Sequence, residues 1–159
     1  MSSVVIIRGV REEWGVLGNM SPGEVIYDGR YWPRSEHLFQ ALRLSDADLQ
    51  EEIRLIANPM AAKFASKRIR RENPDKVRVT PMSEEDLDLM RLVLRLKHDQ
   101  NDEVQATLRM TKQRTIVEDC TKRQRGSGMF WGAALQADGS WKGLNWLGVL
   151  WGELRVKVS

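Results

Sequence analysis

The sequence has few of the residues that form disulfide bonds or structural metal sites. Its 159 residues include one cysteine and two histidines. A single cysteine, Cys120, excludes a disulfide within the chain and suits a reducing compartment, so we expect a cytoplasmic protein. A structural zinc site takes four nitrogen or sulfur ligands, and His37, His98 and Cys120 supply only three. No metal site is therefore expected.

Long apolar runs are also missing. The N-terminal run Val4 to Ile7 ends at Arg8, and no later stretch is long enough to span a bilayer. We therefore expect neither secretion nor insertion into a membrane. The phosphate-binding glycine loop, the dinucleotide fingerprint and the nucleophile elbow are absent as well. Classical nucleotide-binding folds and serine hydrolases are thus disfavoured.

The composition is that of an ordered globular protein. Hydrophobic residues make up 42% of the chain and charged residues 30%, with a net charge of +3. A chain of this length buries roughly two-thirds of the surface that its unfolded form exposes, so it needs no disulfide bond or metal ion for stability. We expect one domain over residues 1–159. The small positive charge is only weak support for nucleic-acid binding.

The patterning predicts an α-rich α+β fold with a small N-terminal hairpin and short strands. Val4 to Ile7 is predicted as a strand, and Glu24 to Trp32 as a hairpin that turns at Asp28-Gly29. Residues 67–78 are expected to form a loop, and residues 115–117 a short strand. Signals for helix starts recur at Ser35, Ser45, Asn58-Pro59, Ser83 and Asp102, and a last helix is expected from Leu144 to about Val156.

Lys97 lies at a revealing position on the longest predicted helix. The apolar stripe through Leu87, Met90 and Leu94 continues at Lys97, because residues three and four apart share a helix face. A lysine buried there has a lowered pKa and can act as a neutral amine nucleophile. Alternatively, its stem snorkels to solvent at the end of the helix.

Glu36 is the second candidate, in the first turn of the helix predicted from Ser35. It can serve as a catalytic carboxyl, or it can only complement the positive end of the helix dipole. Trp131, in Phe130-Trp131-Gly132, is either a platform for a base or a packing residue. A basic run can contact phosphates or form a solvated helix face. This run consists of Lys63, Lys67, Arg68, Arg70 and Arg71.

The block Trp32-Pro33-Arg34-Ser35-Glu36-His37-Leu38-Phe39-Gln40-Ala41 resembles the signature of the NADAR, or YbiA-like, domain family. The resemblance continues in order over about residues 14–156. It includes Gly18-Asn19-Met20, Asn58-Pro59, Lys97 through Gln100, Val117-Glu118, Trp131-Gly132 and Gly143 through Gly148.

This resemblance implies an N-glycosidase that hydrolyses a bond between ribose C1 and nitrogen and needs no cofactor. The expected substrates are ADP-ribose on guanine bases of nucleic acid or phosphorylated early riboflavin intermediates, with an ADP-ribosyltransferase toxin as a candidate partner. Glu36 and Lys97 are the expected catalytic residues. The expected substrate-binding residues are Asn19, Trp32, His37, Gln40, Glu118, Trp131 and Asn145.

Four features depart from the family pattern. Gly128 replaces an acidic residue that often lies three positions before the Trp-Gly pair, and His98 stands where the family has phenylalanine. Lys67 stands where the family has arginine, and residues 133–142 form a longer loop. The missing acid keeps a second reading open, in which the protein is a non-catalytic module that binds ADP-ribose or nucleic-acid phosphate.

Overall fold

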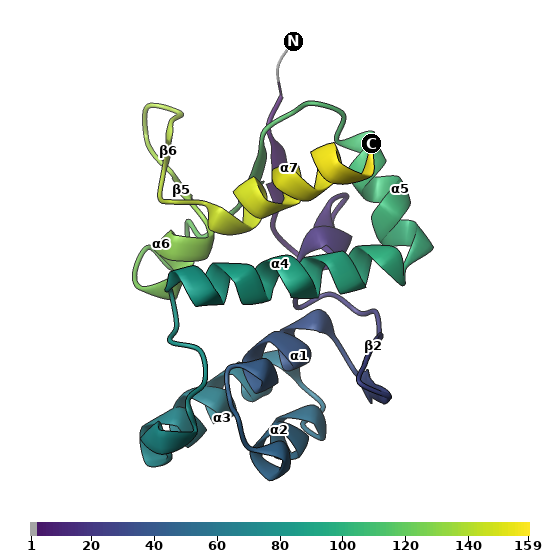
Figure 1. Cartoon of the computed structure of the whole chain (residues 1–159). Helices are drawn as coiled ribbons and strands as arrows, with labels where there is room; N and C mark the ends of the chain where they lie inside the picture. Colours follow the sequence, from purple (N-terminus) through teal and green to yellow (C-terminus); the bar gives the residue numbers. More distant parts are fainter. Residues whose placement is uncertain (1–2) are drawn as a thin grey trace. The chain divides into compact units, whose positions relative to one another are not determined.

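The computed structural model describes residues 3–159, and these residues form two compact units (Figure 1). One unit is the continuous segment Asn19–Asn101. The other combines the chain up to Gly18 with Asp102–Ser159. The expectation of one domain over residues 1–159 stays a prediction, and each unit is described on its own.

In the unit of residues 19–101, a central helix is surrounded by three others. Helix α1 (Ser35–Leu42) packs against α2 (Ala47–Arg54), α3 (Pro59–Glu72) and α4 (Glu84–Asp99). All eight residues of α1 are buried, including its polar ones. Before it come the antiparallel strands β2 (Val25–Tyr27) and β3 (Arg30–Trp32). The predicted hairpin is thereby confirmed, and Asp28 and Gly29 both adopt the positive φ that its turn requires.

The helix starts follow the sequence signals only in part. Asn58 caps α3 and Ser83 caps α4 through side-chain hydrogen bonds, as predicted. Ser35 and Ser45 do not act as caps. The cap of α2 is Asp46, whose carboxylate accepts from the Leu49 N–H at 3.0 Å. The Ser35 hydroxyl instead donates to Asn19, and α1 begins without a side-chain cap.

The predicted loop over residues 67–78 is wrong. Helix α3 continues to Glu72, where Asn73-Pro74 ends it, and a 3-10 turn η2 (Pro74–Lys76) follows. Arginine and lysine are good helix formers, so the basic run extends the helix. The residues of the basic run therefore lie on two different faces of α3.

The apolar stripe of α4 is buried as predicted, and a buried ion pair joins this helix to α1. Arg43 donates through Nε to Asp86 Oδ1 at 2.9 Å and through Nη2 to Oδ2 at 2.6 Å. Both side chains are almost fully buried. The Arg43 guanidinium also lies over the Phe39 ring, 4.4 Å from its centroid. Each charge thus depends on its partner, because an unpaired charge in this position would be strongly desolvated.

The second unit is built around a two-stranded parallel sheet. Strand β1 (Val5–Ile7) pairs with β4 (Ile116–Glu118). Helix α7 (Trp146–Val158) packs on β4 and contacts both α5 (Asp102–Met110) and α6 (Ser127–Trp131). A Cβ at Gly148 would lie 1.9 Å from the Ile116 carbonyl oxygen, so glycine allows this close packing of α7.

The remaining elements of this unit are a 3-10 turn η1 (Gly15–Leu17) and a small hairpin. The hairpin pairs β5 (Ala134–Leu135) with β6 (Trp141–Lys142) and accounts for the long segment after Trp131. The fold class is therefore the α-rich α+β class that the patterning predicts. Within residues 3–159, no helix is both long and apolar enough to cross a membrane.

The buried ion pair gives a test of the packing between α1 and α4. Replacing Asp86 by Asn should lower the free energy of unfolding by about 3 kcal/mol or more, because Arg43 would remain buried without a counter-charge. Asp88→Asn on the same helix is the control, since Asp88 is exposed. Its effect should stay within about 0.5 kcal/mol. Urea unfolding of both variants measures the difference, and equal losses would contradict a stabilising role for the buried Arg43–Asp86 pair.

Candidate functional site

Lys97 ends the buried stripe of α4 and points into the protein. Its side chain is only 2% exposed, so the snorkelling alternative is wrong. The ammonium Nζ donates to Ser21 Oγ at 2.9 Å and to Ser35 Oγ at 3.4 Å. Two hydroxyl groups thus hold the amine beside the N-terminus of α1.

Asn19 connects this lysine to the start of α1. Its side-chain oxygen accepts from the Ser35 hydroxyl at 2.9 Å, and its backbone oxygen accepts from the Glu36 N–H at 3.2 Å. The Asn19 amide nitrogen contacts the Met90 sulfur at 3.1 Å. Asn19, Ser35, Glu36 and Lys97 therefore belong to one connected cluster, which brings two predicted catalytic residues and one predicted binding residue together.

Glu36 is a buried carboxyl group whose pKa differs from that of an exposed glutamate. Burial raises the Glu36 pKa, and the negative charge of Asp86 adds to the rise. The hydrogen bond from Gln40 and the positive charges of Lys63 and Arg43 act in the opposite direction. The surroundings of Glu36 thus favour its acid form. A glutamate that only complemented the helix dipole would not need such burial.

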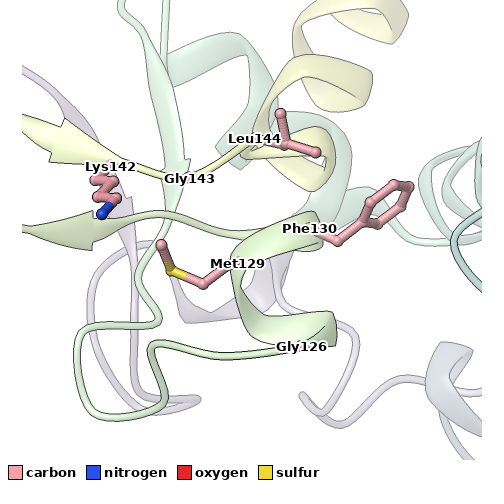
Figure 2. A pocket seen from close by; sticks show the side chains of 6 residues that line it. All are labelled: Gly126, Met129, Phe130, Lys142, Gly143 and Leu144. Carbon is pink, nitrogen blue, oxygen red and sulfur yellow. The ribbon is translucent and has the colours of Figure 1, made fainter.

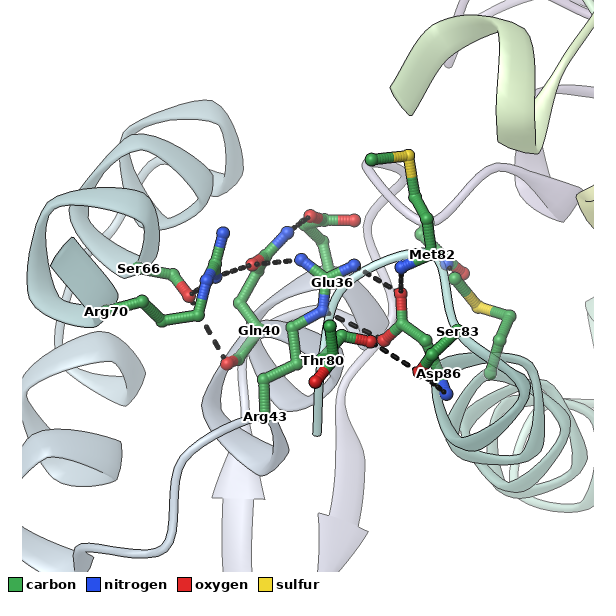
Figure 3. A network of polar contacts seen from close by, with 11 residues as sticks. Glu36, Gln40, Arg43, Ser66, Arg70, Thr80, Met82, Ser83 and Asp86 are labelled. Atoms are coloured by element: carbon green, nitrogen blue, oxygen red, sulfur yellow. Dashed lines mark hydrogen bonds and ion pairs between the residues drawn. The ribbon is translucent and has the colours of Figure 1, made fainter. Parts of the chain in front are cut away.

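Gln40 links Glu36 to two arginines, as Figure 3 shows. Its amide nitrogen donates to Glu36 Oε2 at 2.6 Å. Its amide oxygen accepts from Nη1 of Arg43 and Nη1 of Arg70, each at 3.3 Å. Because the arginines occupy the oxygen, the donating end of the amide faces Glu36. Gln40 therefore separates the carboxyl group from both guanidinium groups.

His37 and Trp32, two predicted binding residues, lie inside the protein. His37 Nε2 is 2.6 Å from the Ile56 carbonyl oxygen, so this nitrogen carries the proton. Burial lowers the pKa of His37, which favours the neutral ring. Within residues 3–159, neither His37 Nδ1 nor Trp32 Nε1 has a hydrogen-bond partner. Contact between these side chains and a substrate stays a prediction.

The other three predicted residues meet in the unit that holds β4. Asn145 precedes α7 in a left-handed conformation, and its side-chain oxygen accepts from the Glu118 N–H at 2.9 Å. Its amide nitrogen donates to the Ile116 carbonyl at 2.8 Å. The Asn145 N–H in turn donates to the carbonyl of Gly132, the residue after Trp131. Glu118, Trp131 and Asn145 are thus held by one backbone framework.

The half-buried Trp131 ring packs edge-on against Phe130, with centroids 4.8 Å apart. Gly128 lies three residues earlier, in the same short helix α6. A Cβ at Gly128 would lie 2.5 Å from the Arg123 carbonyl oxygen. The acidic side chain that the family resemblance leads us to expect there would require a different path for the preceding loop.

Beside α6 is an open hollow in the protein surface (Figure 2). Its side chains are apolar except for Lys142, and its six residues do not include Trp131. They are Gly126, Met129, Phe130, Lys142, Gly143 and Leu144.

Two cationic residues of the basic run lie near Glu36, and the sequence pattern does not distinguish them from the rest of the run. Lys63 and Arg70 lie on the face of α3 that carries buried Ser66. The charge of Lys63 acts on Glu36, and Arg70 donates to Gln40. Lys67 and Arg68 are exposed, and Arg68 pairs with Glu52 and Glu72. A spacing of seven residues from Lys63 to Arg70, two helical turns, was the available signal.

The NADAR domain model matches residues 8–159 of the chain. N-glycosidase YbiA of Escherichia coli strain K12 is 31% identical over 157 residues, which cover 99% of this chain and 89% of that protein. N-glycosidase YbiA of Shigella boydii serotype 4 is 30% identical, with the same coverage. The NMR structure of the E. coli protein YbiA matches with a TM-score of 0.73 at 29% identity, covering 99% of this chain and 86% of that one.

These matches show that the chain belongs to the NADAR domain family. The similarity to named N-glycosidases supports an N-glycosidase-like function in general. Among residues 3–159, no group of three or more histidine, cysteine, aspartate or glutamate side chains could hold a metal ion.

Trp131 offers a test of the binding role that the resemblance implies. If its ring stacks on a base, Trp131→Ala should weaken the binding of ADP-ribose by about 1 to 3 kcal/mol while the protein remains folded. Titration calorimetry measures the affinity, and thermal unfolding serves as the control. A large loss of stability with unchanged affinity would instead assign Trp131 to packing.

Proposed function

We propose that this protein is an N-glycosidase that hydrolyses the bond between ribose C1 and a nitrogen atom. The observation that carries the proposal is the cluster of Asn19, Ser35, Glu36 and Lys97, in which a buried carboxyl group and a buried amine flank the start of one helix. Relatives named N-glycosidases support the same chemistry.

In the proposed reaction, Glu36 is the general acid. Burial raises its pKa, which favours the protonated carboxyl group, and this group can give its proton to the departing nitrogen. As the bond between C1 and nitrogen breaks, the electron pair goes to the nitrogen and positive charge develops on the ribose. Water then adds to C1, and its proton returns to Glu36. The products are the amine and the released sugar, which still carries its phosphate group.

Lys97 has two proposed routes to the same products. As an ammonium, it can orient ribose hydroxyl groups by hydrogen bonding, and water attacks C1 directly. As a neutral amine, it can attack C1 and form an imine with the opened sugar, which water then hydrolyses. Both routes consume one water molecule and need no cofactor.

The substrate is proposed to be either ADP-ribose attached to a guanine base of nucleic acid or a phosphorylated early intermediate of riboflavin synthesis. Both carry a ribose C1–N bond and a phosphate group. An ADP-ribosyltransferase toxin would be a partner only in the first case. Incubating the protein with each substrate and detecting the released sugar by mass spectrometry tests the proposal. Binding without release would favour the non-catalytic module.

Glu36→Gln should lower kcat by roughly a hundredfold or more, the usual scale for a general acid. Glutamine can still accept the hydrogen bond from Gln40, and the variant no longer buries an ionisable carboxyl group, so its melting temperature should not fall. Glu85→Gln, at an exposed site on α4, is the matched control and should retain full activity. Undiminished turnover in Glu36→Gln would remove Glu36 from the mechanism.

The pH dependence of kcat/KM should report the Glu36 proton. A general acid contributes below its pKa and loses its contribution as the pH rises through that value. Because burial raises the Glu36 pKa, the decline should occur above the range of an exposed glutamate. The decline should disappear in Glu36→Gln. A decline that persists in this variant belongs to another group.

Lys97→Arg separates the two routes, because arginine keeps the positive charge but cannot supply a neutral amine. We expect near-complete loss of activity, and borohydride added during turnover should trap a covalent adduct on Lys97 of the wild type. Lys67→Arg, at an exposed position, is the control. An active Lys97→Arg enzyme together with no trapped adduct would exclude the imine route.

A further inference from the structure

Arg70 differs from most arginines of its unit in having no acidic partner. Arg30, Arg43 and Arg68 each pair with a carboxylate. Within the described residues, Arg70 has no carboxylate at ion-pair distance. Its hydrogen bonds go to neutral groups, from Nη1 to Gln40 Oε1 and to Ser66 Oγ. The opposite end of the guanidinium, with Nε and Nη2, is left to other acceptors.

This uncompensated charge is partly buried. Burial, together with the positive charge of Arg43 and against the opposing effect of Asp86, lowers the pKa of Arg70 to about 10. Asp86 cannot neutralise Arg70, because both of its oxygens bond to Arg43. An anion at Arg70 would relieve the unfavourable burial of its charge.

The charges around Gln40 leave Arg70 without compensation. Arg43 and Asp86 compensate each other, and burial favours the neutral acid form of Glu36. The positive charge of Lys63, on the same helix as Arg70, also acts on Glu36. A phosphate group at Arg70 would supply the negative charge that this residue lacks.

We propose that Arg70, assisted by Lys63, binds the phosphate group on the ribose whose C1–N bond is cleaved. This inference rests on the proposed function, and it names the recognition group of that site. Gln40 joins Arg70 to Glu36 through two successive hydrogen bonds of 3.3 Å and 2.6 Å. A substrate that contacts both residues is therefore held by its phosphate at one end and by Glu36 near C1.

Bound phosphate would also act on the proposed acid. Its negative charge lies on the side of Gln40 away from Glu36 and disfavours ionisation of the carboxyl group. Phosphorylated substrates should thus keep Glu36 protonated to higher pH than unphosphorylated ones. Recognition and proton donation are coupled through the same pair of helices, α1 and α3.

The test is binding of ribose 5-phosphate, ADP-ribose and unphosphorylated ribose, measured by titration calorimetry. Arg70→Gln should weaken binding of ribose 5-phosphate roughly 10- to 100-fold, as expected for the loss of a charge-assisted hydrogen bond. The neighbouring Arg71→Gln removes the same charge from an exposed position and should bind like wild type. Unphosphorylated ribose should bind weakly and equally to all three proteins.

The two phosphorylated sugars distinguish a terminal phosphate from a diphosphate bridge. A loss for both in Arg70→Gln supports recognition of the phosphate on C5, whichever substrate is physiological. Equal binding by wild type, Arg70→Gln and Arg71→Gln would overturn the inference, even in an active glycosidase. Conversely, Arg70-dependent binding without any glycosidase activity would overturn the proposed function and leave the phosphate site in place.

Discussion

The main constraint on this structure is that α1 is buried along its whole length and yet carries polar side chains. A buried polar group without a hydrogen bond costs several kcal/mol in an apolar environment, so the neighbours of α1 must supply partners. Ser35 bonds to Asn19, Gln40 to Glu36 and two arginines, and Arg43 to Asp86. The positions of α3 and α4 around α1 therefore follow largely from the need to place these partners beside it.

The same constraint produces the chemistry of the site. An arginine bonded directly to Glu36 would hold the carboxyl group in its ionised form. The neutral amide of Gln40 occupies that position instead, while the two arginines bond to its far end. Through the contacts of Gln40, the protein keeps positive charge close to Glu36 without bonding an arginine directly to the carboxyl group. The side chain of Gln40 thus serves both the packing of α1 and the acid–base properties of Glu36.

Features that depend on local periodicity could be predicted from the sequence. The buried stripe of α4 extends by simple counting to Lys97, and the turn residues locate the β2–β3 hairpin. Contacts between distant residues could not be predicted in this way. Arg43 and Asp86 are 43 positions apart, and nothing in the sequence marks them as a pair.

The sequence also does not show which residues of the basic run face α1 and which face solvent, because its pattern predicts a loop over residues 67–78. Once α3 continues to Glu72, helical geometry places Arg70 toward α1 and Arg71 toward solvent. The predicted cap at Ser35 failed for a related reason. Ser35 has the right residue type for a cap, but a partner from another segment, Asn19, takes its hydroxyl group.

The amide of Asn145 has a consequence beyond holding Glu118 in place. It accepts from one backbone group of β4 and donates to another, which are the bonds that a neighbouring strand would make. Ala133 continues this pairing along β4 with the Glu118 carbonyl. A free strand edge invites pairing with another molecule and leads to aggregation. One side chain before α7 thus occupies backbone groups at one edge of the two-stranded sheet that would otherwise be open to another strand.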